Sequence, residues 1–202
     1  MPAPIPCRSC LGLSLCLALL QGCAAGLSSS STDVPNADAT VRSGFHFSLG
    51  LGGGKADLTC DGCLFDSRTS YSGFLAVARP VAQKTLLGIE ATGWTNERSG
   101  STVQIWSLMA HLTQYLSQSS GLFLSGGLGL TGFREYGGFQ ELSGNGLGFS
   151  GRLGYEIGTG GVAIVPYVGY LGSLGGVGVS TEETSADLTI HNFQFGLGIA
   201  VP

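Results

Sequence analysis

The sequence has 202 residues, enough for one domain with short extensions, and it contains 35 glycines, 43% hydrophobic residues and only 11% charged residues. The net charge of −4 and the lack of a Lys/Arg cluster argue against binding to a nucleic-acid backbone. Glycine at this level occurs in low-complexity chains, but here the glycines lie inside regularly alternating apolar runs, which predicts folded strands.

The chain begins with the features of an export signal. Arg8 gives a weakly positive start, residues 11–20 form an apolar run, and small residues follow in 21–26. We therefore expect residues 1–25 to be a signal peptide. No other stretch approaches the roughly 18 consecutive apolar residues that a membrane helix needs.

A second motif overlaps the end of this signal. The sequence LQGC at 20–23 resembles the bacterial lipobox, in which the cysteine becomes lipidated, and this makes Cys23 a candidate lipidation site. The alternative is ordinary cleavage near Ala25, which would discard Cys23. Both alternatives send the chain across the inner membrane of a bacterium.

The next segment changes in composition. Residues 26–43 are small, polar and aperiodic, which is typical of a flexible linker. From Gly44 onward alternating patterns continue to the end of the chain. We therefore expect one folded domain over residues 44–202.

This domain contains eight segments in which apolar residues alternate with small or polar ones, the pattern of strands with two different surroundings. The last segment shows it most clearly, with Phe193 and Phe195 on one face and Gln194 and Gly196 on the other. The seventh segment is apolar on both faces, so its orientation stays open. The segments are 45–51, 71–80, 85–94, 102–116, 122–133, 146–157, 162–174 and 191–202.

The connections between these segments alternate in length. Short turns follow the second, fourth and sixth segments, at 80–84, 117–121 and 158–161. Longer polar segments follow the others, at 52–70, 95–101, 134–144 and 175–189. An even number of strands with short turns at one end and long loops at the other is typical of a transmembrane β-barrel.

The composition of the two strand faces supports this interpretation. A soluble barrel would expose many charged residues, since soluble domains average about 25% of them. The faces without bulky residues are instead rich in Gly, Ser, Thr and Ala, which suit the narrow interior of an eight-stranded barrel. The bulky faces then contact lipid, and closure satisfies every backbone polar group. We predict an all-β, eight-stranded antiparallel up-and-down transmembrane β-barrel.

The few charges in mid-strand lie on the small-residue face. They are Glu90, Arg152 and Glu156. An unpaired charge in the lumen is costly, so we expect Arg152 to pair with at least one of the two glutamates. Our hypothesis is a structural ion cluster that fills the lumen, and the alternative is a role in gating or permeation.

These strands resemble the small eight-stranded outer-membrane β-barrels, such as the OmpA transmembrane domain and the OmpX/OmpW-like proteins. The resemblance covers residues 44–202. In residues 194–201 a polar residue, Gly and apolar residues follow the spacing of a β-barrel assembly signal, although the chain ends in Val201-Pro202 rather than an aromatic residue. The resemblance implies a bacterial outer-membrane location, with outer-membrane lipids and the barrel assembly machinery as partners. It maps no catalytic motif onto the chain, and we expect no cofactor.

Two cysteines fall in the first long polar segment. Cys60 and Cys63 form a CxxC pair, which occurs in redox motifs, metal sites and local disulfides. No βαβ context and no second pair of ligands accompany them. An exported loop is in an oxidising compartment, so we predict a Cys60–Cys63 disulfide and no metal site.

The histidines His46, His111 and His191 are too scattered in the predicted strands for one metal site. Some eight-stranded barrels modify lipid A, and His191 follows Asp187 closely in sequence, but ordinary polar roles explain both residues. We therefore expect no enzyme. The leading hypothesis is an outer-membrane barrel with a structural or surface-interaction role or passive passage of small solutes. The alternative is an exported lipocalin-like barrel that binds a small apolar ligand.

Overall fold

The computed structural model describes residues 44–60, 67–98, 100–117, 120–137, 141–158, 161–180 and 185–201. Within these ranges the regular elements are β1 (His46–Cys60), β2 (Arg68–Ala82), β3 (Thr85–Arg98), β4 (Ser101–Tyr115), β5 (Leu122–Tyr136), β6 (Leu142–Tyr155), β7 (Ala163–Ser180) and β8 (Ser185–Val201). No helix in these ranges is long and apolar enough to cross a membrane. The predicted signal peptide, Cys23 and the linker lie outside the described residues and stay predictions.

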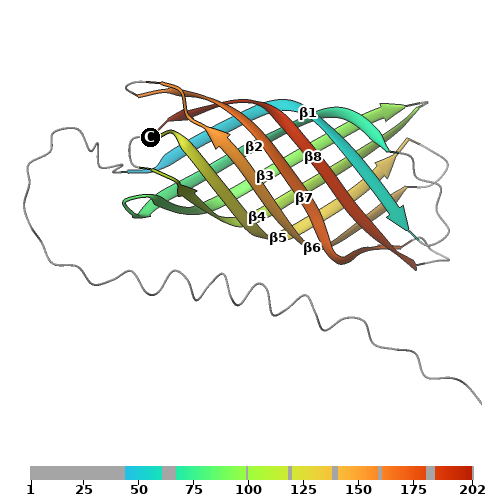
Figure 1. Cartoon of the computed structure of the whole chain (residues 1–202). Helices are drawn as coiled ribbons and strands as arrows, with labels where there is room; N and C mark the ends of the chain where they lie inside the picture. Colours follow the sequence, from blue (N-terminus) through green and yellow to red (C-terminus); the bar gives the residue numbers. More distant parts are fainter. Residues whose placement is uncertain are drawn as a thin grey trace, which may run out of the picture. The chain divides into compact units, whose positions relative to one another are not determined.

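The eight strands form a closed antiparallel barrel in which each strand pairs with the next along the chain. Figure 1 shows the strands tilted around the barrel, with the end of β8 beside the start of β1. The register between these two strands closes the ring and runs from the Phe47–Val201 pair to the Cys60–Leu188 pair. The predicted fold is confirmed.

The two ends of the barrel differ. The start of β1 and the end of β8 lie at one end, which we call the turn end. Residues 83–84, the ends of β4 and β6 and the starts of β5 and β7 lie at this end too. The opposite end is the loop end. There the strands continue into the polar segments expected as long loops: β1 extends to Cys60 and β7 to Ser180. Pairing in the barrel satisfies the backbone donors and acceptors of these segments, which a loop would leave to water.

An apolar belt surrounds the outside of the barrel. On β8 the outward residues from Phe193 to Val201 are all bulky and exposed. Residues 193–201 span about 26 Å along the strand, or about 20 Å along the barrel axis at a tilt of about 40°. This height is close to the apolar band of about 25 Å in transmembrane barrels, so the belt is a lipid-facing surface.

Above this belt, toward the loop end, the polarity of the two faces reverses. On β1 the outward residues change to Lys55 and Asp57, while the inward residues Ala56 and Leu58 are buried. The barrel is therefore built here like a water-soluble one and projects beyond the belt. The loop-end cluster that fills its interior consists of Ala56, Leu58, Trp94, Val103, Ile105, Met109, Phe133, Leu171, Val177, Leu188 and Ile190.

A bulge in β7 lies at the level of this reversal. Gly175 and Gly176 have φ angles of 77° and 91°, a left-handed conformation that favours glycine. The pairing of β7 with β8 shifts here. Ser173 Oγ accepts a hydrogen bond of 2.9 Å from the backbone N–H of Ile190, and the strand beyond the bulge places Val177 in the loop-end cluster. A side chain thus compensates for a backbone partner that the bulge displaces.

Candidate functional site in the lumen

The centre of the lumen contains a buried ion pair. Glu90 on β3 and Arg152 on β6 point inward from strands on different sides of the barrel. Arg152 Nη1 lies 2.6 Å from Glu90 Oε2, and Nη2 lies 2.9 Å from Oε1, so the contact is bidentate. Thr92 Oγ1 donates a further hydrogen bond of 3.3 Å to Glu90. Such charge-assisted pairs are strong and directional, which fixes both side chains across the lumen.

Two aromatic rings enclose the arginine. Arg152 Cζ lies 3.5 Å from the ring centroid of Phe74 and 5.2 Å from that of Tyr167. The two rings meet edge to face with their centroids 4.9 Å apart. The guanidinium is therefore desolvated against π faces that favour a cation. Gly50 on β1 makes room for this arrangement, because a Cβ there would overlap the Phe74 ring.

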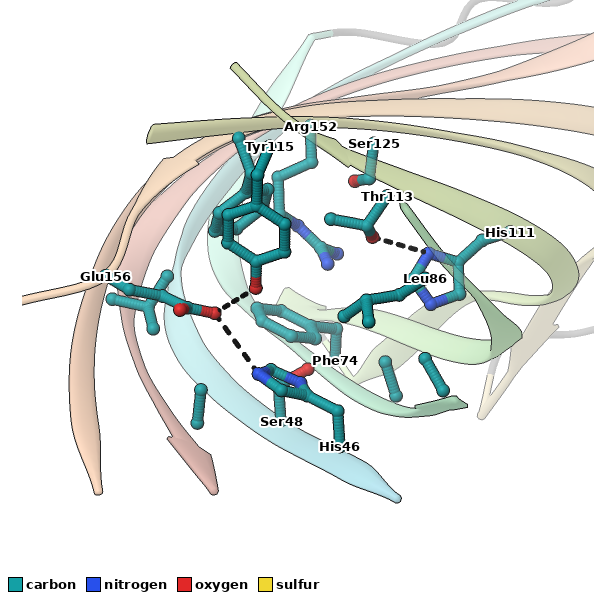
Figure 2. Close-up of a pocket in the computed structure, with 15 residues that line it drawn as sticks. His46, Ser48, Phe74, Leu86, His111, Thr113, Tyr115, Ser125, Arg152 and Glu156 are labelled. Carbon is teal, nitrogen blue, oxygen red and sulfur yellow. Dashed lines mark hydrogen bonds and ion pairs between the residues drawn. The ribbon is translucent and has the colours of Figure 1, made fainter. Parts of the chain in front are cut away.

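The third predicted cluster residue, Glu156, lies nearer the turn end. Its carboxylate oxygen Oε1 is 3.2 Å from His46 Nε2 and accepts a hydrogen bond from the Tyr115 hydroxyl. Figure 2 shows these three side chains meeting on one side of the pocket, while Thr113 and His111 are joined on another. The structure thus places Arg152 against Glu90 and places Glu156 in a second polar contact.

The space left between these groups is small. A cavity of about 30 Å³ lies between the ion pair and the turn end, and this volume holds about one water molecule. Toward the turn end the lumen is filled by a second apolar cluster of Ala78, Leu86, Tyr115, Phe123, Val165 and Ala200. With the loop-end cluster above, the described side chains fill the lumen at three successive levels.

Sequence reasoning missed several members of this interior. Tyr167 lies in the seventh segment, which is apolar on both faces, and Phe74 is followed directly by the apolar Leu75, so alternation does not orient it. His46 and Tyr115 lie at strand ends. The alternation of inward and outward residues along β1 could have identified His46, since the even-numbered residues of this strand point inward. This alternation does not give the position of a side chain along the barrel axis, which depends on the stagger between strands.

The remaining candidate residues lie away from the lumen centre. Cys60 ends β1, but Cys63 lies outside the described residues, so the disulfide stays a prediction. His191 is on the outward face, where its Nδ1 contacts the Tyr170 hydroxyl. Within the described ranges no three His, Cys, Asp or Glu side chains gather in a way that could hold a metal ion.

Comparison with known proteins gives matches in structure but not in sequence. No family model matches the chain, and no curated protein matches it. The fold is similar to the crystal structure of Neisserial surface protein A, with a TM-score of 0.57 and 17% identity over 79% of this chain and 97% of that one. It is also similar to Ail, the attachment invasion locus protein of Yersinia pestis, with a TM-score of 0.54 and 15% identity over 77% and 97%.

These similarities establish the fold, and the apolar belt establishes its surroundings. A closed barrel of eight antiparallel strands, exposed bulky residues around its middle and a packed lumen define a small outer-membrane β-barrel. The chain is an integral outer-membrane barrel protein. The lipocalin-like alternative is not favoured, because the lumen cavity is far too small for an apolar ligand and the exterior of the barrel is apolar.

Proposed function

We propose that the chain is a sealed outer-membrane barrel whose projecting loop end serves a structural or surface-interaction role at the cell surface. The single observation that carries this proposal is the filled lumen. The Arg152–Glu90 pair lies across its centre, and an apolar cluster closes it on each side. Passive passage of solutes, the other role expected from sequence, would need a continuous aqueous path.

The outer end supports a surface role in a second way. The strands continue beyond the lipid belt as a paired, well-packed barrel, so the loop end is a rigid support for the segments of sequence that join these strands. Two of the solved structures similar to this chain carry the names surface protein and attachment invasion locus protein. Those names describe the relatives, and for this chain they support the hypothesis of contact with molecules outside the cell.

A conductance measurement tests the sealed lumen. The barrel, refolded and shown to be folded by heat-modifiable gel mobility, is added to a planar bilayer, with a general porin as the positive control. We expect no steady conductance from the wild type. A Trp94→Ala, Phe133→Ala variant supplies a matched control, because it removes two large rings from the loop-end cluster and should leak more. Discrete, reproducible channels from the wild type would contradict the proposal.

Export and maturation belong to the same proposal. A signal peptide over residues 1–25 would deliver the chain to the barrel assembly machinery, which would insert it among outer-membrane lipids. Mass measurement of the mature N-terminus distinguishes cleavage near Ala25 from lipidation of Cys23, and Cys23→Ser abolishes only the second. Alkylation with and without reduction tests the proposed Cys60–Cys63 disulfide. We propose no enzymatic activity for the barrel.

A further inference from the structure

An exposed aromatic ring lies on the outside of the barrel near the loop end. Trp106 on β4 points outward with 42% of its surface exposed, and its cross-strand partner is Gly132 on β5. The indole lies directly against the backbone at Gly132, since a Cβ there would overlap the ring. One side of the ring is therefore supported by the sheet, and the remainder faces the surroundings.

Polar side chains beside this ring hold one another in place. Gln104 Nε2 donates a hydrogen bond of 3.2 Å to the Tyr136 hydroxyl, and the Arg134 guanidinium lies 5.7 Å from the Tyr136 ring centroid. Arg134 Nε donates a 2.8 Å hydrogen bond to Glu141 Oε1. We call Gln104, Trp106, Arg134, Tyr136 and Glu141 the rim platform. The four polar members are linked by these contacts and Trp106 rests on the backbone at Gly132, so little ordering is needed on binding.

The rim platform lies where the outward face of the barrel changes from apolar to polar. On β4 the outward residues between Trp106 and the turn end begin with Leu108, Ala110 and Leu112, which belong to the lipid belt. The outward residues toward the loop end are Gln104 and Thr102. Trp106 therefore lies at the level of the lipid headgroups of the leaflet nearest the loop end.

We propose that the rim platform binds the sugar headgroup of an outer-leaflet glycolipid. The C–H face of a pyranose packs on an indole, while amide, carboxylate and guanidinium groups bind adjacent hydroxyls in pairs. A headgroup with only a phosphate would need a cation without an ionic partner, but Glu141 already neutralises Arg134. This inference rests on the proposed function, in which the loop end faces the cell exterior.

The tryptophan content of the chain allows a direct test. The sequence has only two tryptophans, and Trp94 is buried in the lumen, where its Nε1 donates a 3.0 Å hydrogen bond to the Gly54 carbonyl. Trp94→Phe therefore leaves Trp106 as the reporter. The full barrel in neutral detergent is titrated with digalactosyl diacylglycerol, or with phosphatidylglycerol of the same acyl chains. We expect only the glycolipid to protect Trp106 from acrylamide quenching, by severalfold.

Native mass spectrometry of the wild-type barrel gives a second readout that does not depend on Trp94→Phe folding. We expect retention of the glycolipid to fall about tenfold in Trp106→Leu and several-fold in Gln104→Ala. The matched control is Leu128→Ala, an exposed belt position on β5, which should retain the glycolipid as the wild type does.

Equal protection by phosphatidylglycerol, or undiminished retention in Trp106→Leu and Gln104→Ala, would overturn the inference and leave Trp106 as an ordinary interfacial anchor. Conductance of the same preparation separates the two proposals. A silent barrel without glycolipid preference contradicts only the rim platform, whereas a conducting barrel contradicts the sealed lumen whatever the lipid result.

Discussion

Removing Arg152 is the perturbation whose effect the structure defines best. Arg152→Met keeps much of the side-chain volume between Phe74 and Tyr167 but leaves the Glu90 carboxylate buried without its cation. Breaking a buried ion pair in this way costs about 3–5 kcal/mol. Loss of the cation–π contact adds up to about 2 kcal/mol. We expect the free energy of unfolding to fall by at least about 3 kcal/mol.

A double-mutant cycle separates the stranded charge from simple loss of packing. Glu90→Gln alone leaves the guanidinium unpaired and should also destabilise. The double variant Glu90→Gln, Arg152→Met strands no charge, and replacing both partners of a buried pair is often close to neutral. We therefore expect the double variant to recover most of the stability lost in Arg152→Met.

The assay is denaturant unfolding in detergent or lipid, followed by tryptophan fluorescence and by heat-modifiable gel mobility. Trp94 reports on the lumen, because it is only 2% exposed in the folded barrel. An unchanged free energy of unfolding in Arg152→Met would refute the claim that the Arg152–Glu90 pair stabilises the barrel. A double variant as unstable as the single ones would show that packing, rather than an uncompensated charge, dominates at this position.

The remaining predictions concern the lipid belt, the bulge in β7 and the pairing of β1 with β8 that closes the barrel. Phe195→Arg should lower the free energy of unfolding by about 2–4 kcal/mol, because it puts a charge in the lipid belt. The matched control is Thr189→Arg, which lies on the same outward face of β8 but beyond the belt. It should cost about 0–1 kcal/mol in the same unfolding assay. Ser173→Ala leaves the buried Ile190 N–H without its acceptor and should cost about 1–3 kcal/mol, with faster amide exchange at Ile190. Gly196→Ala should lower the folded fraction on gels, since a Cβ there would overlap a carbonyl oxygen of β1; wild-type folding would contradict this close approach.

The sequence predicts the barrel because two independent patterns agree. Period-two alternation defines the strands, and small residues on the inward faces indicate a narrow lumen surrounded by lipid. In β8 the alternation of Phe193 and Phe195 with Gln194 and Gly196 holds in the structure residue by residue. The orientation of β7 could not be read in the same way, because both its faces are apolar: Val165 and Leu171 point into the two lumen clusters.

The polar extensions of the strands were harder to recognise for a physical reason. Lys55 and Asp57 look like loop residues when a strand is identified by its bulky outward face. They continue the outward face of β1, while Ala56 and Leu58 take over the inward face as the apolar one. The alternation of inward and outward residues is unbroken, and only the surroundings of the outward face change, from lipid to water. A search that accepted apolar residues on either the outward or the inward face would have extended the strand to Cys60.

This reversal also explains how one barrel can have two kinds of interior. At the level of the belt the exterior is fixed as apolar by lipid, and the lumen holds the buried Glu90–Arg152 pair beside the smaller apolar cluster at the turn end. Beyond the belt the exterior is wet, and the lumen becomes the only place where apolar side chains are shielded from water. The loop-end cluster around Trp94 therefore stabilises the part of the barrel that lipid does not surround, and the same packing closes the lumen. The sealed lumen that we propose would thus be a physical consequence of strands that continue past the membrane as a folded barrel.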